Sequence, residues 1–147
     1  MKFESEISVL SYASVVGKKE GEGPLKNSFD SIYNDELLGE DSFEKAESKL
    51  QKLSVTAALQ KSKLTEKNID LIFAGDLLNQ CIGSSFGLKD LEIPFVGMYG
   101  ECSTMALSTI MAALAIESGA AEKTVSVTSS HFCSAERQFR FPLEYGG

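Results

Sequence analysis

A short and almost continuous apolar run at residues 69–74 (IDLIFA) is the feature that most restricts what this chain can fold into. The run is too short for a typical buried helix and stops at Gly75, so it predicts a β-strand covered on both faces. Two helices and two further strands are predicted to alternate with it, at residues 41–60, 93–99, 103–118 and 123–129. This alternation predicts an α/β fold in which right-handed crossovers connect the strands of a mostly parallel sheet.

The two predicted helices have different patterns. Residues 41–60 form an amphipathic segment, and Asp41 with Glu44 three residues later is typical of a capping box. The apolar residues of this segment recur at spacings of three and four and so share one face: Phe43, Ala46, Leu50, Leu53, Ala57 and Ala58. Residues 103–118 are apolar almost all round, which predicts a helix buried on most sides and ended by Gly119.

The remaining segments are less regular. Residues 8–16 (SVLSYASVV) predict another strand, and the glycine-rich residues 17–26 predict a loop. The strand at residues 93–99 is expected to be buried. Residues 130–147 have no clean period but contain aromatic side chains that are costly to leave in water, so we expect an ordered loop or cap. At 147 residues, the chain is expected to form one domain.

Composition excludes several functional classes. The chain has 14 basic and 21 acidic residues, a formal net charge of −7 and no basic stripe, so nucleic acid is not an expected partner. The most apolar segment, residues 105–116, is shorter than the roughly 20 residues that cross a bilayer. No apolar leader follows Met1, so we expect no secretory signal peptide.

The cysteine and histidine content narrows the chemistry further. Cys81, Cys102 and Cys133 show no CxxC spacing, which argues against a disulfide framework and favours a reducing compartment. His131 is the single histidine, which excludes a histidine-rich metal site, and no metal is expected. Neither a GxGxxG motif nor a P-loop is present, so no cofactor is expected.

Cys102 is the most informative single residue. It follows a predicted strand and a turn at Gly100 and opens a predicted helix, so it should lie at the carboxyl edge of the sheet, where α/β proteins bind their ligands. A helix N-terminus favours the thiolate that a nucleophilic cysteine requires. The adjacent Glu101 opposes that thiolate, and a small buried cysteine is an equally good interpretation.

Other polar residues are predicted near the same edge. His131 follows the strand at residues 123–129 and could serve Cys102 as a base, but we favour a role in fixing a loop by hydrogen bonds. Asn79 could line a pocket or cap the next helix. Arg137 could bind a carboxylate or form an internal ion pair.

Several motifs in this chain resemble those of the stage V sporulation protein AD family. The segments that carry the resemblance extend over essentially the whole chain: residues 23–25 (GPL), 29–30 (FD), 68–70 (NID), 74–80 (AGDLLNQ), 100–104 (GECST), 129–131 (SSH), 135–142 (AERQFRFP) and 144–146 (EYG). The motif at residues 135–142 is long and unusual, so a chance match is improbable. The short cysteine motif alone would be weak.

This resemblance implies a thiolase-like fold, of which residues 1–147 would form a single N-terminal half-domain, three-layer α-β-α, without the C-terminal half. It implies a sporulation protein that binds dipicolinic acid, or its calcium chelate, without catalysing a reaction. The implied setting is the forespore cytoplasm, where proteins of the same operon, some of them membrane-embedded, would attach the chain peripherally to the spore inner membrane during dipicolinate uptake. Cys102 matches the position of the thiolase nucleophile and of a ligand-pocket cysteine in this family.

Three functions are weighed from the sequence. The first is a dipicolinate-binding module, with an anion near the helix start and these ligand-binding residues: Cys102, Ser103, Thr104, Asn79, His131 and Arg137. The second is an acyltransferase that forms a thioester on Cys102. The third is a fragment without ligand activity that associates through exposed apolar surface. Such surface predicts a homo-oligomer, and residues 93–99 are the candidate edge.

Overall fold

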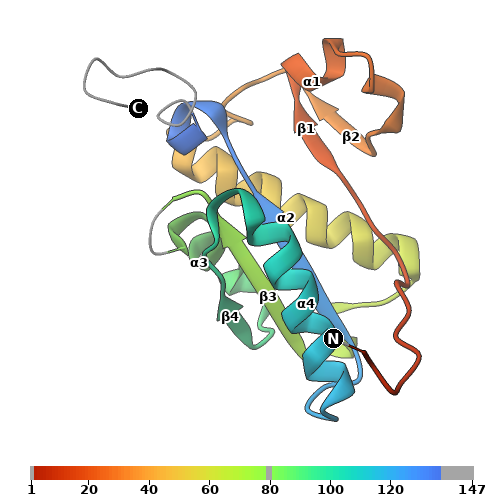
Figure 1. Ribbon diagram of the computed structural model, residues 1–147. Coiled ribbons are helices and arrows are strands. Elements are labelled where there is room, and N and C mark those ends of the chain that lie inside the picture. The colour runs from red at the N-terminus through yellow and green to blue at the C-terminus, as the bar shows by residue number, and fades with distance from the viewer. Residues whose placement is uncertain (1, 79–80, 137–147) are drawn as a thin grey trace.

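The computed structural model describes residues 2–78 and 81–136. Strands and helices alternate along most of the chain (Figure 1), with these bounds: β1 (Val15–Gly17), α1 (Lys18–Glu22), η1 (Lys26–Ser28), β2 (Ser31–Tyr33), α2 (Phe43–Ser62), η2 (Glu66–Asn68), β3 (Leu71–Asp76), α3 (Ile82–Leu88), η4 (Lys89–Leu91), β4 (Phe95–Gly97), η5 (Glu101–Ser103), α4 (Thr104–Glu117), β5 (Thr124–Ser129) and η6 (Phe132–Glu136).

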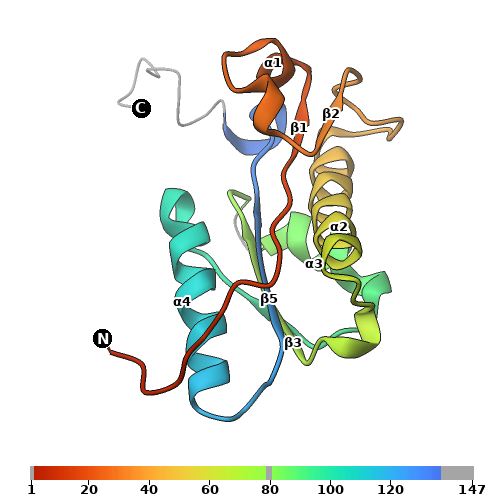
Figure 2. The same ribbon diagram turned by 90° about the vertical axis from the view of Figure 1, so that its right-hand side faces the viewer.

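Three parallel strands form the main sheet, in the order β4-β3-β5. The central strand β3 pairs with β5 over its whole length, from Leu71 opposite Thr124 to Asp76 opposite Ser129. Helices α2 and α3 cover one face of this sheet and α4 covers the other (Figure 2), which gives three layers, α-β-α. The predicted α/β fold with a mostly parallel sheet is therefore confirmed.

The main core lies between the sheet and the layer formed by α2 and α3. Its buried side chains come from both layers and from the connections between them: Val55, Leu59, Ile69, Ile72, Ala74, Leu88, Leu91, Ile93 and Val127. Strand β3 is buried at every residue after Leu71, as its continuous apolar run predicts.

Helix α2 begins two residues later than predicted. Ser42 is the N-cap: its backbone is extended and its hydroxyl accepts a hydrogen bond from the Lys45 N–H at 3.3 Å. Asp41 lies outside the helix and pairs with the Lys45 ammonium at 2.7 Å. The predicted capping box is therefore wrong, because the serine hydroxyl one residue later takes the capping position. The buried face of the helix also includes three polar side chains, Glu47, Ser48 and Gln51.

The N-terminal region departs most from its prediction. Of the strand predicted at residues 8–16, only the last two residues belong to β1, which pairs in parallel with β2 in a separate two-stranded sheet. An extended segment without ladder pairing leads to β1 and runs past β5 (Figure 2), where the Ser11 hydroxyl donates to the Ala58 carbonyl at 2.7 Å. The segment predicted as a glycine-rich loop contains the short helix α1.

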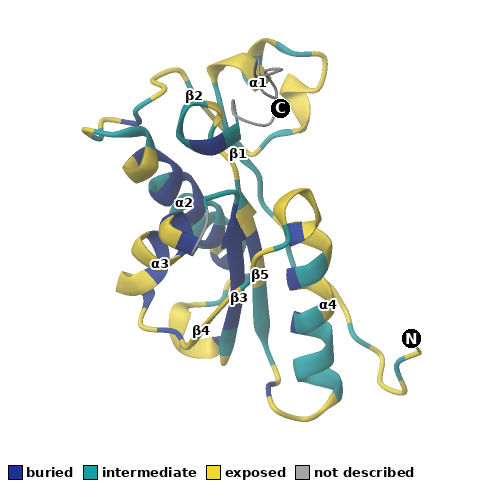
Figure 3. Ribbon diagram, turned by 60° about the vertical axis from the view of Figure 1, so that its left-hand side comes forward, coloured by how far each residue is buried: buried dark blue, intermediate teal, exposed yellow. Residues whose placement is uncertain are grey.

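Two segments predicted as buried are exposed on one side (Figure 3). Strand β4 is an edge of the main sheet, and all three of its residues are exposed. Helix α4 buries only Thr104, Ser108 and Ala112, whereas Met105 is 65% exposed. Both predictions are wrong for the same reason: an apolar sequence is buried only where a neighbouring element is present to cover it.

The end of α4 agrees with its prediction, since Gly119 follows the helix with a φ of 75°. The expected loop or cap at residues 130–147 is described only to residue 136, where η6 forms a π-helical turn, and its remainder lies outside the described residues. Within the described ranges, no helix combines the length and hydropathy that crossing a membrane requires.

Candidate functional site

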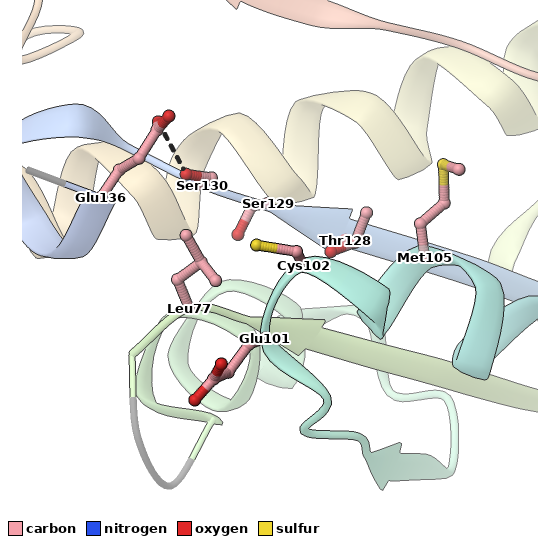
Figure 4. A pocket seen from close by; sticks show the side chains of 8 residues that line it. All are labelled: Leu77, Glu101, Cys102, Met105, Thr128, Ser129, Ser130 and Glu136. Carbon is pink, nitrogen blue, oxygen red and sulfur yellow. Dashed lines mark hydrogen bonds between the residues drawn. The ribbon is translucent and has the colours of Figure 1, made fainter. Parts of the chain in front are cut away.

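A cleft of about 480 Å³ opens at the carboxyl edge of β3 and β5, beside the start of α4 (Figure 4). Its lining comes from the ends of both strands, from η5 with the first turn of α4, and from η6: Leu77, Glu101, Cys102, Met105, Thr128, Ser129, Ser130 and Glu136. This is the edge at which parallel sheets gather their ligands and at which Cys102 is predicted to lie.

Cys102 is exposed in this cleft. It belongs to η5, directly before α4, and the preceding residue Glu101 has a left-handed backbone conformation with a φ of 49°. In Figure 4 the Cys102 thiol points toward Ser129 and Leu77. The predicted placement of the thiol at the start of a helix and beside the strand ends is therefore found.

The turn before α4 packs directly against the end of β3. A side chain at Gly75 would come within 2.1 Å of the Met98 carbonyl oxygen and 2.5 Å of Thr104 Cγ2. Distances this short cannot be tolerated, so the absence of a side chain at Gly75 allows the strand end and the cysteine turn to approach each other.

Ser103 and Thr104, predicted as ligand-binding residues, instead hold the turn together. Ser103 donates to the Gly100 carbonyl from its N–H at 2.9 Å and from its hydroxyl at 2.6 Å. Thr104 is 1% exposed, and its N–H and hydroxyl both donate to the Glu101 carbonyl. Neither residue lines the cleft, and the N–H groups of both donate within the turn, so a ligand-binding role for them stays a prediction.

His131 fixes the chain after β5 by hydrogen bonds. Its Nδ1 accepts from the Cys133 N–H at 3.1 Å, so Nε2 carries the ring proton and donates to the Glu36 carbonyl at 2.9 Å. The ring also stacks on Phe43, with 5.3 Å between ring centroids. Both nitrogens are engaged and His131 does not line the cleft, so the structure does not bring it together with Cys102.

Two predicted site residues, Asn79 and Arg137, lie outside the described residues. Their roles at the cleft stay predictions. Within the described part of the chain, no group of three or more His, Cys, Asp or Glu side chains is arranged to hold a metal ion.

Two acidic side chains line the cleft. Glu101 and Glu136 both line it, and none of its described lining residues is a lysine or arginine. The Ser130 hydroxyl donates to the Glu136 carboxylate at 3.0 Å. Figure 4 shows Glu101 directed away from the Cys102 thiol, on the opposite side from Glu136. A ligand in this cleft would therefore meet one thiol, three hydroxyls, two apolar side chains and two carboxylates.

A buried hydrogen-bond network lies behind the serine wall of the cleft. The Gln51 amide nitrogen has two protons and lies within hydrogen-bond distance of three acceptors, the Gly75 carbonyl at 3.1 Å and the hydroxyls of Ser84 at 3.1 Å and Ser129 at 3.2 Å. Ser84 in turn donates to the Asp76 carboxylate from its N–H and its hydroxyl, at 2.7 and 2.6 Å. One oxygen of Gln51 and one of Asp76 have no partner among the described residues.

Glu47 completes this network. It is 0% exposed, and its two carboxylate oxygens accept from the hydroxyls of Ser129, at 3.0 Å, and Ser134. Burial raises the pKa of Glu47, and the charge of Asp76 adds to this effect. The hydrogen bonds from Ser134 and Ser129 and the proximity of His131 act in the opposite direction without reversing it.

The sequence contained a signal for each residue that the prediction missed. Ser129 ends β5, so the rule that placed Cys102 at the carboxyl edge applies to it and to Ser130 as well. Glu47 follows Phe43 by four residues and precedes Leu50 by three, so it lies within the apolar stripe of α2. A polar side chain at such a position is buried and needs hydrogen-bond partners.

Comparison with known proteins bears on the family to which this chain is similar. The family model for Stage V sporulation protein AD (SpoVAD) matches residues 1–147. Stage V sporulation protein AD of Bacillus subtilis (strain 168) is 43% identical over 145 residues, which are 99% of this chain and 43% of that protein. The chain thus spans less than half the length of the curated relative it matches.

A comparison with solved structures supports the fold. The crystal structure of 3-oxoacyl-(acyl-carrier-protein) synthase III from Aquifex aeolicus VF5 superposes with a TM-score of 0.54 at 16% sequence identity. The match covers 59% of this chain and 30% of that one. At this identity the likeness concerns the fold alone, and it confirms the expected thiolase-like architecture.

Proposed function

The chain belongs to the stage V sporulation protein AD family, and from this premise we propose that it is a non-catalytic protein whose cleft at Cys102 binds dipicolinate as its calcium chelate. The observation that carries the proposal is the open cleft at the carboxyl edge of the sheet, where an exposed thiol lies beside three hydroxyl groups. Its volume of about 480 Å³ is in the range of small-molecule sites.

The charge of the cleft favours the calcium chelate over free dipicolinate. Free dipicolinate is a dianion, and the Glu101 carboxylate lines the cleft. Like unit charges about 6 Å apart repel by about 3 kcal/mol at an effective dielectric constant of about 20, which corresponds to roughly a hundredfold in affinity. The one-to-one calcium chelate is neutral and escapes this repulsion.

The lining residues also suit the shape and chemistry of the chelate. Dipicolinate is a planar aromatic ring that holds calcium through its nitrogen and one oxygen of each carboxylate. Calcium takes about six to eight oxygen ligands, so positions remain for hydroxyl or carboxylate oxygens of the protein. Leu77 and Met105 offer apolar surface for the ring. The Thr128 hydroxyl lines the same cleft, whereas the hydroxyls of Ser129 and Ser130 already donate to Glu47 and Glu136.

Acyl transfer is the less favoured function. A cysteine that forms a thioester needs a base nearby and an oxyanion hole. The cleft lining includes no described histidine or lysine, and the nitrogens of His131 are engaged elsewhere. Incubation with an acyl-coenzyme A followed by mass spectrometry tests this: we expect no acyl adduct on Cys102, and stoichiometric acylation would overturn the non-catalytic proposal.

The proposal extends to partners and location. We place the protein in the forespore cytoplasm, held at the spore inner membrane by other proteins of the dipicolinate uptake machinery, some of them membrane-embedded. We also expect a homo-oligomer through the exposed edge of β4, because its unpaired backbone groups can continue the sheet into a second copy. Co-purification with those proteins from sporulating cells would support this location. Recovery of the protein in a cytoplasmic fraction that lacks those proteins would contradict it.

Isothermal titration calorimetry tests the ligand proposal directly. The purified chain is titrated with dipicolinate, with calcium, and with the equimolar mixture. We expect the mixture to bind more tightly than either component, and we expect Cys102→Ala to weaken this binding. Glu101→Gln should reduce the difference in affinity between the calcium chelate and the free dianion. Glu122→Gln, an exposed change just before β5 at the other end of the sheet, is the matched control. Equal affinity for free dipicolinate, or binding unchanged in Cys102→Ala, would contradict the proposal.

A further inference from the structure

Two separate segments that form the cleft wall are attached to α2 by one buried side chain. Ser129, at the end of β5, donates to one oxygen of the Glu47 carboxylate at 3.0 Å. The Ser134 hydroxyl, in η6, lies within hydrogen-bond distance of the other oxygen. Ser129 lines the cleft itself, and η6 contributes Glu136 to it. Glu47 does not line the cleft, so any influence on it passes through these two hydroxyls.

The hydrogen bonds around Glu47 can all form at once only if the Glu47 carboxyl group carries a proton. The Ser134 hydroxyl lies within hydrogen-bond distance of both Glu47 and the His131 carbonyl, the latter at 3.0 Å, but it has a single proton to donate. If Glu47 is ionised, the Ser134 hydroxyl can donate either to Glu47 or to the His131 carbonyl, but not to both. If Glu47 is protonated, it donates to Ser134, Ser134 donates to His131, and Ser129 still donates to the other Glu47 oxygen.

The electrostatic surroundings favour the same state. Glu47 is fully buried, and none of the salt bridges formed by the described residues involves it. An unpaired charge in such a place costs several kcal/mol. The titratable groups nearest to it on other elements are Asp76 on β3, whose charge opposes ionisation, and His131, whose proximity favours it. Strand β5 and helix α3 have no titratable side chain, and η6 adds Cys133 and Glu136.

We propose that Glu47 is a positioning residue which, as a neutral carboxylic acid, holds the end of β5 and η6 in place and so shapes the cleft at Cys102. On ionisation Glu47 can no longer donate to Ser134, so Ser134 keeps its hydrogen bond to either Glu47 or the His131 carbonyl but not to both. A buried charge is also left between α2 and η6, and the attachment of η6 to α2 therefore weakens as the pH rises. The inference concerns the cleft wall and does not depend on which ligand the cleft binds.

Hydrogen exchange measured by mass spectrometry without any ligand tests this inference. Glu47→Gln reproduces the neutral acid, because its amide nitrogen can donate to Ser134 while its oxygen accepts from Ser129. We expect η6 amides to be equally protected in wild type and Glu47→Gln at pH values below the raised pKa of Glu47. At higher pH, we expect the wild type to lose protection relative to the variant, by up to roughly tenfold per pH unit once Glu47 ionises.

Two further variants keep the test decisive. Glu44→Gln changes an exposed glutamate on the same helix and should match wild type at every pH. Ser134→Ala removes the hydroxyl, so it should lower η6 protection at low pH as well. The inference would be overturned if the ratio of Glu47→Gln to wild-type protection stayed constant with pH. A Glu47 carboxylate paired with a cation would give that result. Because no ligand is used, failure of the calcium chelate proposal would leave this result unaffected.

Discussion

The two faces of the main sheet are covered by helices of opposite character. On one face, α2 has a mostly polar sequence yet buries a dense apolar core together with Glu47 and Gln51. On the other, α4 is apolar almost throughout but buries only three of its residues and leaves Ile110 47% exposed. Burial therefore follows from which neighbouring elements are present and what they bond to, and the share of apolar residues in a helix predicts it poorly.

The largest expected effect on stability comes from truncating a buried isoleucine of the sheet, compared with an exposed isoleucine of α4. Ile72 in β3 is fully buried, so Ile72→Ala should reduce the free energy of unfolding by about 2–5 kcal/mol through lost burial and a new cavity. Ile110→Ala on α4 should cost less than about 1 kcal/mol because half of the side chain is already exposed. Urea unfolding of both variants measures this, and similar losses would show that α4 is covered as tightly as α2.

The polar part of the α2 face gives the next largest effect. Glu47→Ala leaves the hydroxyls of Ser129 and Ser134 without their hydrogen-bond partner and opens a cavity, so we expect a loss of about 1–3 kcal/mol in the free energy of unfolding. The exposed Glu44→Ala on the same helix should stay within about 0.5 kcal/mol of wild type. Equal effects in urea unfolding would mean that the buried network contributes nothing to stability.

These two faces also show what the sequence could predict. The strand at the centre of the sheet, the alternation around it and the position of Cys102 follow from local patterns: a short apolar run, a terminating glycine, and a cysteine between a strand and a helix. Strand β3 is covered on both faces as expected, because α3 packs against one face and α4 against the other.

The failures have equally specific causes. Strand β4 and helix α4 have buried-type sequences, but no described element covers their outer sides. The strand expected at residues 8–16 has β-forming residues, but strand propensity reflects packing against neighbours and does not by itself create a ladder. Apolar spacing did not predict the burial of Glu47, because that pattern considers only the apolar residues of a buried helix face.

The pH dependence of stability gives a smaller effect that isolates Glu47. Its folded pKa is raised above the ordinary value of 4.5, so the native state binds the proton more tightly than the unfolded state. Its contribution to stability is therefore fully present below about pH 4.5 and is lost as the pH rises through the raised value. Glu47→Gln cannot ionise, so its stability relative to wild type should increase across that window. Urea midpoints at a series of pH values would show this, and a difference independent of pH would contradict it.

The smallest expected change in stability concerns the exposed face of α4. Ile110→Lys should alter the free energy of unfolding by no more than about 0.5 kcal/mol, because the side chain is largely at the surface. The same change should reduce self-association if the apolar face of α4 contributes to it. Sedimentation velocity at several concentrations would measure the monomer and the oligomer. An association constant unchanged by Ile110→Lys would assign self-association to another surface, such as the edge of β4.

The cleft at Cys102 is tested most directly by nuclear magnetic resonance titration of the isotopically labelled chain with the calcium chelate of dipicolinate. We predict saturable shifts at the amides of Cys102 and residues 128–130 and at the Met105 and Leu77 methyl groups, with no change in the groove between α2 and α3 around Lys49 and Phe86. Shifts confined to that groove, or no saturable shift anywhere at millimolar ligand, would contradict the assignment of the binding site.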